Sequence, residues 1–458
     1  MGYDGSKESK EALRLAKKHA KRMDAKLEIA EAIARWDPLE YHKIQKVEQE
    51  LDLDVKEILN GDSALYETHL LVNDSSPEAQ LVEFAERYHV DEIIIGAPKR
   101  TRVGNIERYD GKLMLINRLF PKSYPKLDWI QVEISSYCNA NCIYCPHFAY
   151  RKNWQNRYLP IDTFRNLISA FRKTKLVYLQ GWGEPFTHPQ FFEMVRLAKE
   201  AGCRVGTTSN GTLLNHDIIA RLINEGLDIV GFSLAGVDEK NDRIRKGTRI
   251  KKVLESMEEI HRAKSKYGSD KPRIHIAYML LRSGLDELEK LPEFLSPTGA
   301  DQTVVSSLSF VASPAMESES ILSIGEKGYS ELKQRLIHIR DDSAKKGAEV
   351  HFHIVSPVQN HFSCRENIPR AVVVGSDGST SPCVMKQIPL QGENYYYVRA
   401  RKHMHENLSF GNINKDTLNS IWHRQEYQQF VRDFQKGKAP SICRNCLKRN
   451  IDNLDQGV

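Results

Sequence analysis

Three cysteines on one short stretch constrain this 458-residue chain more than any other feature of its sequence. They are Cys138, Cys142 and Cys145, in the run CNANCIYC, so their spacing is CxxxCxxC. Three thiolates on one loop can hold three corners of a 4Fe-4S cube and leave the fourth iron open for a small-molecule ligand. The spacing therefore predicts a reactive iron–sulfur site as well as a structural one.

Two simpler interpretations of this triplet compete with the cluster. A zinc site needs a fourth Cys or His nearby, and His147 lies only two residues after Cys145, which is closer than ordinary zinc ligand spacing. An electron carrier of the ferredoxin type would supply a fourth cysteine, and none follows locally. A cluster with three protein ligands is the interpretation that the local sequence favours.

Charge and hydropathy limit the classes of protein that this chain can represent. The 66 Lys and Arg are interleaved with 60 Asp and Glu, which is typical of a solvated surface and not of a nucleic-acid interface. No apolar run approaches the ~20 residues of a membrane span, and the start MGYDGSKESK lacks the hydrophobic stretch of a signal peptide. We therefore expect a cytoplasmic protein without membrane or nucleic-acid partners, whose clustered cysteines bind metal in preference to forming disulfides.

Residues 1–112 are expected to form a small, doubly wound α/β domain. Apolar spacing predicts a helix over 7–22, and alternation at 27–29 predicts a strand after it. Ser76, followed by a proline, is placed to begin a second helix, which leads to the apolar strand 92–96 and a basic loop. Strands and helices that alternate in this way indicate a parallel sheet.

The same region resembles the universal stress protein family over roughly residues 2–105. The resemblance rests on the run DGS at 4–6 before a helix, and on Gly96 before a basic, glycine-containing loop. Members of this family often bind ATP at these two segments. Lys99 stands where the family has a glycine, and no clear Gly-Ser pair follows to cradle phosphates. ATP binding and a scaffold or dimerisation role therefore both stay open.

A regular alternation of strands and helices follows the proline-containing segment 113–127, which is expected to be a linker. Candidate strands lie at 129–134, 176–180, 204–208, 228–234, 273–281 and 303–311. Six βα units predict a parallel, partial (β/α) barrel over 128–325. Active sites in such folds gather at the C-terminal ends of the strands, and the cysteine loop follows the first of them.

Motifs at the ends of four strands resemble the radical S-adenosylmethionine (SAM) superfamily over roughly 128–325. Besides the cysteine loop they are GWGEP at 181–185, TSNG at 208–211 and NDRIRKG at 241–247. The resemblance implies an enzyme that cleaves SAM reductively at a 4Fe-4S cluster and abstracts hydrogen from a substrate with the 5′-deoxyadenosyl radical. It also implies an electron donor of the ferredoxin or flavodoxin type.

Seven residues at these strand ends are expected to bind SAM: Tyr144, Gly183, Glu184, Ser209, Asn210, Ser233 and Arg245. Tyr144 would lie near the adenine, Gly183 would permit close approach, and Glu184 would face the ammonium. The three short polar side chains suit ribose or carboxylate hydrogen bonds, and Arg245 suits the carboxylate. Each also has a structural interpretation, since Glu184 can cap a turn, Ser233 can satisfy backbone groups and Arg245 can lie on the surface.

The C-terminal third carries a second set of cysteines, Cys364, Cys383, Cys443 and Cys446. The strand AVVV and the turn at 376–378 predict a hairpin with ligands at its ends. The pattern resembles the abbreviated "twitch" form of the SPASM domain, which implies one auxiliary 4Fe-4S cluster in a small, cysteine-rich α+β domain over 326–458. A structural zinc is the alternative. Cys203 is expected to be a small buried hydrophobe.

The sequence indicates the substrate less clearly than it indicates the fold or the cofactors. The runs LQGWGEPF and FEMVRLAKEAGCRVGTTSNGT, together with the C-terminal domain, resemble a maturase group associated with tungsten-cofactor oxidoreductases. A peptide-modifying radical SAM maturase is the second enzyme hypothesis, so the substrate would be a protein, a peptide or a cofactor precursor. A third hypothesis, from a different class, is an iron–sulfur redox or nucleotide sensor in which the N-terminal domain reports to the cluster domain.

Overall fold

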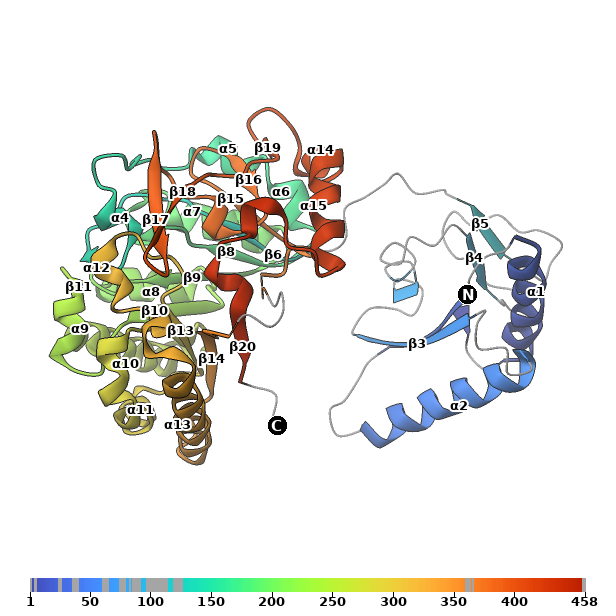
Figure 1. The fold of residues 1–458 in the computed structure, drawn as a ribbon. Coiled ribbons are helices and arrows are strands. Elements are labelled where there is room, and N and C mark those ends of the chain that lie inside the picture. Colours follow the sequence, from blue (N-terminus) through green and yellow to red (C-terminus); the bar gives the residue numbers. More distant parts are fainter. Residues whose placement is uncertain are drawn as a thin grey trace. The chain divides into compact units, whose positions relative to one another are not determined.

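The chain folds into two compact units, Met1–Pro125 and Lys126–Val458 (Figure 1). The computed structural model describes residues 2–3, 6–23, 27–34, 41–59, 66–73, 80–81, 84, 92–95, 114–117, 127–358, 364 and 366–454. Within these ranges, no helix combines the length and the apolar content that a membrane crossing requires.

The first unit is built on a five-stranded sheet with the order β3-β2-β1-β4-β5. Its elements are β1 (Gly2–Tyr3), α1 (Lys7–Met23), β2 (Leu27–Ala34), α2 (Tyr41–Leu59), β3 (Tyr66–Asn73), β4 (Glu92–Ile95) and β5 (Met114–Asn117). The first four strands are parallel, as expected, and β5 is antiparallel to β4. The expected linker at 113–127 therefore contains a strand, because the apolar run MLIN covers an otherwise open sheet edge.

Helical periodicity accounts for the core of this first unit. Ala12, Leu13 and Ala16 of α1 pack with Ile29 of β2 and with one face of α2. Helix α1 and strands β2 and β4 agree with the prediction from the sequence, whereas α2 was not predicted. The DG of the DGS run, Ser76, Gly96 and the basic loop with Lys99 lie outside the described residues, so ATP binding stays untested.

An eleven-stranded sheet forms the centre of the second unit, with the order β19-β16-β15-β6-β8-β9-β10-β12-β13-β14-β20. The six expected strands are β6 (Leu127–Val132), β8 (Thr174–Leu179), β9 (Arg204–Ser209), β10 (Ile229–Leu234), β12 (Arg273–Leu280) and β13 (Gln302–Ser307). Each begins within two residues of its expected start, and all pair in parallel. The last strand ends at Ser307, four residues early, because Leu308 and Val311 leave the sheet to join an apolar cluster.

Strands from the segment 326–458 extend both edges of this parallel sheet. After α13 (Gly325–Lys345), β14 (Val350–Val355) pairs in parallel with β13, and β15 (Ala371–Val374) pairs in parallel with β6. Antiparallel strands follow at the two ends, β16 (Ser379–Ser381) and β19 (Gly411–Asn412) at one and β20 (Ile451–Asn453) at the other. The expected boundary at residue 325 thus falls inside one continuous sheet.

Helices alternate with the barrel strands along the chain and follow the last of them (Figure 1). The longer ones are α7 (Phe191–Glu200), α8 (His216–Asn224) and α10 (Ile250–Tyr267), and the shorter ones are α5 (Ile161–Arg165), α6 (Ile168–Phe171), α9 (Glu239–Ile244), α11 (Leu291–Leu295) and α12 (Pro314–Glu317). In α10, Val253, Met257 and Ile260 are buried at helical spacing. The helix ends at Gly268, whose φ of 61° is the left-handed conformation that glycine adopts readily.

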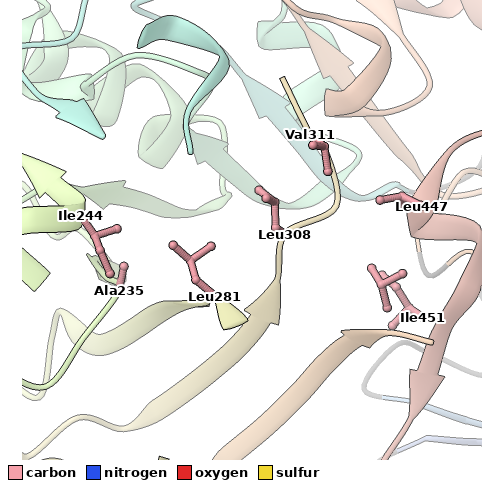
Figure 2. Close-up of a cluster of buried hydrophobic side chains, with 8 residues drawn as sticks. Ala235, Ile244, Leu281, Leu308, Val311, Leu447 and Ile451 are labelled. Carbon is pink, nitrogen blue, oxygen red and sulfur yellow. The ribbon is translucent and has the colours of Figure 1, made fainter. Parts of the chain in front are cut away.

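The C-terminal segment packs onto the ends of the barrel strands through an apolar cluster (Figure 2). Ala235 follows β10, Leu281 follows β12 and Leu308 follows β13, and they pack with Leu447 and Ile451 from the end of the chain. Full burial of such a side chain contributes about 1.5–3 kcal/mol. The cluster therefore fixes the C-terminal segment next to the strand ends at which the expected site residues lie.

Candidate active site and a second cysteine cluster

The cysteine loop begins where β6 ends and is held on one side by a short strand pair. In this pair β7 (Asn141–Cys142) lies antiparallel to β11 (Arg245–Lys246), with Arg245 directly opposite Cys142. Burial raises the pKa of the Cys138 thiol to about 11 and that of Cys145 to about 12, and the neighbouring thiols add to both shifts. Two thiols whose pKa is raised in this way need added positive charge to ionise, and iron would supply it. The loop fits the expected three-cysteine cluster site.

Arg245 is buried next to this loop and is not a surface residue, so that structural interpretation is wrong. Only 5% of the residue is exposed, and its guanidinium donates a hydrogen bond to the Tyr144 hydroxyl. Its Nε is buried, and no described residue accepts a hydrogen bond from it. A buried guanidinium with an open donor needs an anionic partner. The expected pairing of Arg245 with the SAM carboxylate stays a prediction, and this open donor is consistent with it.

The GWGEP loop lies directly against the cysteine loop. The amide of Glu184 donates to the carbonyl of Tyr137 at 2.7 Å. A Cβ on Gly183 would lie 2.4 Å from the carbonyl oxygen of Ser135 and 2.5 Å from that of Tyr137. Only glycine fits this contact, so the close approach that Gly183 permits is made to the cysteine loop. Its approach to SAM stays a prediction.

The expected residues Glu184, Ser209 and Asn210 meet in one buried network. Glu184 is 2% exposed, and its carboxylate accepts from the Ser209 hydroxyl at 2.8 Å and from the Asn210 amide at 2.7 Å. Burial raises the pKa of Glu184, and these hydrogen bonds oppose the shift. The Asn210 side chain donates to Asn139 of the cysteine loop at 2.8 Å. Ser233 lies half-buried at the C-terminal end of β10.

Glu133, which the sequence analysis missed, joins the barrel to the C-terminal hairpin. It is 2% exposed and follows β6, and its carboxylate accepts from the Trp182 amide at 2.8 Å and from the Ser376 hydroxyl at 2.9 Å. Burial raises its pKa to about 7 in spite of these donors. A glutamate directly after a strand with buried positions was the signal that could have identified it.

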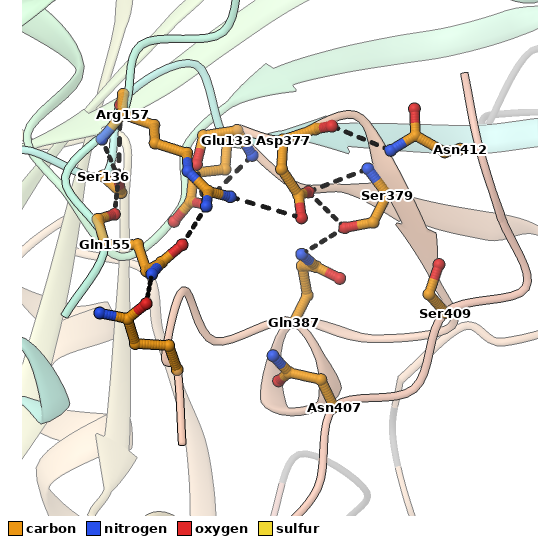
Figure 3. Close-up of polar contacts among 12 residues, drawn as sticks. Glu133, Ser136, Gln155, Arg157, Asp377, Ser379, Gln387, Asn407, Ser409 and Asn412 are labelled. Carbon is orange, nitrogen blue, oxygen red and sulfur yellow. Dashed lines mark hydrogen bonds and ion pairs between the residues drawn. The ribbon is translucent and has the colours of Figure 1, made fainter. Parts of the chain in front are cut away.

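Further polar contacts surround the hairpin turn (Figure 3). The Arg157 guanidinium lies 3.7 Å from the Asp377 carboxylate, and the Gln387 amide donates to the Ser379 hydroxyl at 2.7 Å. Gly378, at the turn, has a φ of 80°. The predicted hairpin of β15 and β16 is confirmed, and its turn is tied to residues that follow the cysteine loop.

The four remaining expected ligands line a single cavity, although they come from separate segments. These residues are Cys364, Cys383, Cys443 and Cys446. Burial raises the pKa of each of the four thiols, so they too need added positive charge to ionise. Two phenylalanines of α15 (Gln425–Gln435), Phe430 and Phe434, also line the cavity, and α14 (Leu418–Trp422) precedes this helix. Four convergent thiols fit a 4Fe-4S cluster.

Cys203 lies apart from both groups. It is 3% exposed before β9, and its thiol donates to the carbonyl oxygen of Phe171. It has the environment expected of a small buried hydrophobe.

Three family models match the chain in consecutive segments. Residues 1–106 match the universal stress protein family, residues 132–295 match the radical SAM superfamily, and residues 364–447 match SPASM, an iron–sulfur cluster-binding domain. Residues 132–295 therefore form a radical SAM domain. The radical SAM match contains the three loop cysteines, and the SPASM match contains the four cysteines of the cavity. These two domains imply iron–sulfur clusters and SAM binding for this enzyme.

Curated relatives match part of the chain and, in one case, most of it. The tungsten-containing aldehyde ferredoxin oxidoreductase cofactor-modifying protein of Pyrococcus furiosus is 25% identical over 337 residues, which cover 71% of this chain and 88% of that protein. The AdoMet-dependent heme synthase of Methanosarcina barkeri is 31% identical over 115 residues, which cover 25% of this chain and 33% of that protein.

Two solved structures share the fold. Streptococcus suis SuiB bound to S-adenosylmethionine has a TM-score of 0.50 at 13% identity, with 89% of this chain and 83% of that chain covered. Native anSMEcpe with bound AdoMet has a TM-score of 0.50 at 17% identity, with 70% and 87% covered. The radical SAM core of this enzyme therefore has the architecture of structures that hold SAM.

Proposed function

We propose that Cys138, Cys142 and Cys145 ligate the 4Fe-4S cluster of this radical SAM enzyme. When bound, the cluster and SAM supply a 5′-deoxyadenosyl radical that abstracts hydrogen from a substrate carbon. The observation that supports the site most directly is the buried Arg245 opposite Cys142, whose Nε finds no acceptor among the described residues. Its planar guanidinium is suited to the carboxylate of SAM.

The protein's own residues would orient SAM at the cluster. The interlocked contacts of Gly183 and Glu184 with the cysteine loop fix the two motifs relative to each other. Ser209 and Asn210 hold the Glu184 carboxylate in one position, and Glu184 would present its charge to the SAM ammonium from there. Tyr144 would lie near the adenine, and Ser233 would bond the ribose or the carboxylate. A site preorganised in this way spends less entropy on aligning the reacting atoms.

SAM cleavage tests this assignment. We expect reconstituted protein with dithionite and SAM to form 5′-deoxyadenosine, even without substrate. Arg245→Met should raise the Kd for SAM at least tenfold, and Arg245→Lys should recover part of the loss, since lysine keeps the charge but not the planar fork. Arg243→Met, at an exposed position two residues away, is the matched control. Absence of 5′-deoxyadenosine in every condition would contradict the proposal.

The four cysteines of the cavity are proposed to hold one auxiliary 4Fe-4S cluster. Four protein ligands leave no iron open, which suits electron transfer more than substrate binding. Iron and sulfide analysis of the reconstituted chain should give about eight irons, four for each cluster. About four irons together with one zinc would overturn the second cluster.

For the substrate, we propose a role in maturing the cofactor of a tungsten-containing oxidoreductase. The Pyrococcus relative supports this, because the similarity extends over 71% of this chain and so beyond the barrel alone. Immature oxidoreductase or its cofactor should raise 5′-deoxyadenosine formation above the uncoupled rate, with ferredoxin or flavodoxin in place of dithionite. If a short precursor peptide stimulated 5′-deoxyadenosine formation and the oxidoreductase or its cofactor did not, the peptide-modifying alternative would be favoured. Turnover that depends on ATP would support a nucleotide site in the first unit.

A further inference from the structure

A buried lysine faces the four-cysteine cavity, and no carboxylate of the described residues is paired with it. Lys386 lies three residues after Cys383, is 6% exposed and lines the cavity together with the four cysteines. Its ammonium is 3.4 Å from the carbonyl oxygen of Glu406, which is long for an N–H···O bond. Among the described residues, no carboxylate lies within ion-pair distance of it.

The neighbouring charges do not compensate this ammonium. Lys448 and Glu366 also line the cavity, but they pair with each other. Arg449, the remaining charged residue of the lining, adds a further positive charge. Lys386 lines the same cavity as Cys443 and Cys446, and its positive charge opposes the rise in the pKa of both thiols. The cavity is therefore lined by more positive than negative side chains.

A buried charge costs several kcal/mol unless an opposite charge compensates it. A 4Fe-4S cluster with four thiolate ligands is anionic, and its negative charge grows by one on reduction. A fixed cation next to it stabilises the reduced state more than the oxidised state, and net charge is among the factors that set the potential of such clusters.

We propose that Lys386 is the internal counter-cation of the auxiliary cluster and raises the reduction potential of that cluster. This inference rests on the proposed assignment of the four cysteines to a 4Fe-4S cluster. Lys386 is a positioning and tuning residue, since it acts by supplying charge to the cluster. It biases the second cluster toward accepting an electron, which agrees with full ligation by cysteine.

The test is a redox titration of the reconstituted, full-length protein, followed by electron paramagnetic resonance. The signal of the auxiliary cluster is recognised because SAM perturbs only the other cluster. Lys386→Met keeps an apolar stem and removes the charge, whereas Lys386→Arg keeps the charge. Lys251→Met removes one charge at an exposed position of α10 and is the matched control.

We expect Lys386→Met to shift the potential of the auxiliary cluster to a more negative value, while Lys386→Arg and Lys251→Met leave it near that of the wild type. Loss of the auxiliary cluster in the Met variant but not in the Arg variant would also support a charge-based role. An unchanged potential in an iron-replete Met variant would overturn the inference. Loss of the cluster in both variants would overturn it too, because packing would then be the function of Lys386. Zinc in the wild-type protein would instead remove the proposed second cluster itself.

Discussion

The two cysteine sites of this enzyme are assembled in opposite ways. In the first site, Cys138, Cys142 and Cys145 lie on one loop after β6. The four cysteines of the second site come from separate segments, the first at Cys364 and the last at Cys446. Three local ligands depend little on the rest of the fold for their spacing. Four distant ligands converge only if the hairpin, α15 and the final segment are all in place.

The residues that surround the two sites also differ. Next to the first lies Arg245, with a buried donor that no described residue satisfies, as expected where a ligand is to bind. The second is enclosed by Phe430, Phe434 and charged side chains of the protein itself. This difference supports the proposal that the first site performs chemistry on a small molecule, while the second stores or passes an electron.

Removal of a loop ligand should have the largest effect. We expect Cys142→Ala to abolish formation of 5′-deoxyadenosine and to lower the iron content by about half, from about eight atoms to about four. Cys203→Ala, at a buried cysteine outside both sites, should retain both properties. Wild-type rates in the Cys142 variant would break the assignment of chemistry to the first site.

Disturbing the contact between the GWGEP loop and the cysteine loop should have the second largest effect. Gly183→Ala places a methyl group against the backbone of the cysteine loop, which cannot yield, and overpacking of this kind costs about 1–3 kcal/mol. We expect the SAM affinity, measured by equilibrium binding, to fall at least tenfold. Gly284→Ala is the control, since its added methyl would meet only Leu280, at 3.9 Å. Equal behaviour of the two variants would contradict the role of Gly183.

Glu133 links the two sites and gives the stability a pH dependence. The pKa of its carboxyl is raised to about 7 from an ordinary 4.5, so between these values the native state holds the proton more tightly than the unfolded state. This group therefore stabilises the fold at low pH and loses that contribution as the pH rises to about 7, by about 3 kcal/mol.

Anaerobic unfolding at about pH 5 and pH 8 measures most of this effect. Glu133→Gln should flatten the pH dependence, whereas Glu255→Gln, at an exposed position of α10, should not. The same fall in stability in both variants would assign the pH dependence to other groups.

The smallest effect on SAM cleavage is expected from the second site. In Cys446→Ser the iron content should fall to about four atoms, while uncoupled 5′-deoxyadenosine formation stays within a few-fold of the wild-type rate. Conversion of the substrate to its final product should be lost, because the electron released by the substrate then has no acceptor. If SAM cleavage were lost as well, the two sites would be coupled through the shared sheet, and the comparison between them would need revision.

Much of the second unit was predictable because its signals are local. Hydrophobic runs and the helices between them placed all six barrel strands, and the turn at Gly378 predicted the hairpin. The linker at 113–127 was placed on its prolines alone, and the strand at Met114–Asn117 was missed because four residues give too little periodicity to detect. Helix α2 was missed although its pattern is helical.

The sequence alone determined the three-cysteine loop, because the spacing of ligands on one short segment is a property of that segment. Only the tertiary structure decided which distant groups meet there. It placed β15 beside β6, Arg245 opposite Cys142, Glu133 between two loops and Lys386 beside four cysteines. Such encounters depend on sheet register and on which buried donors and acceptors satisfy one another, and residues far apart in sequence carry no local record of either.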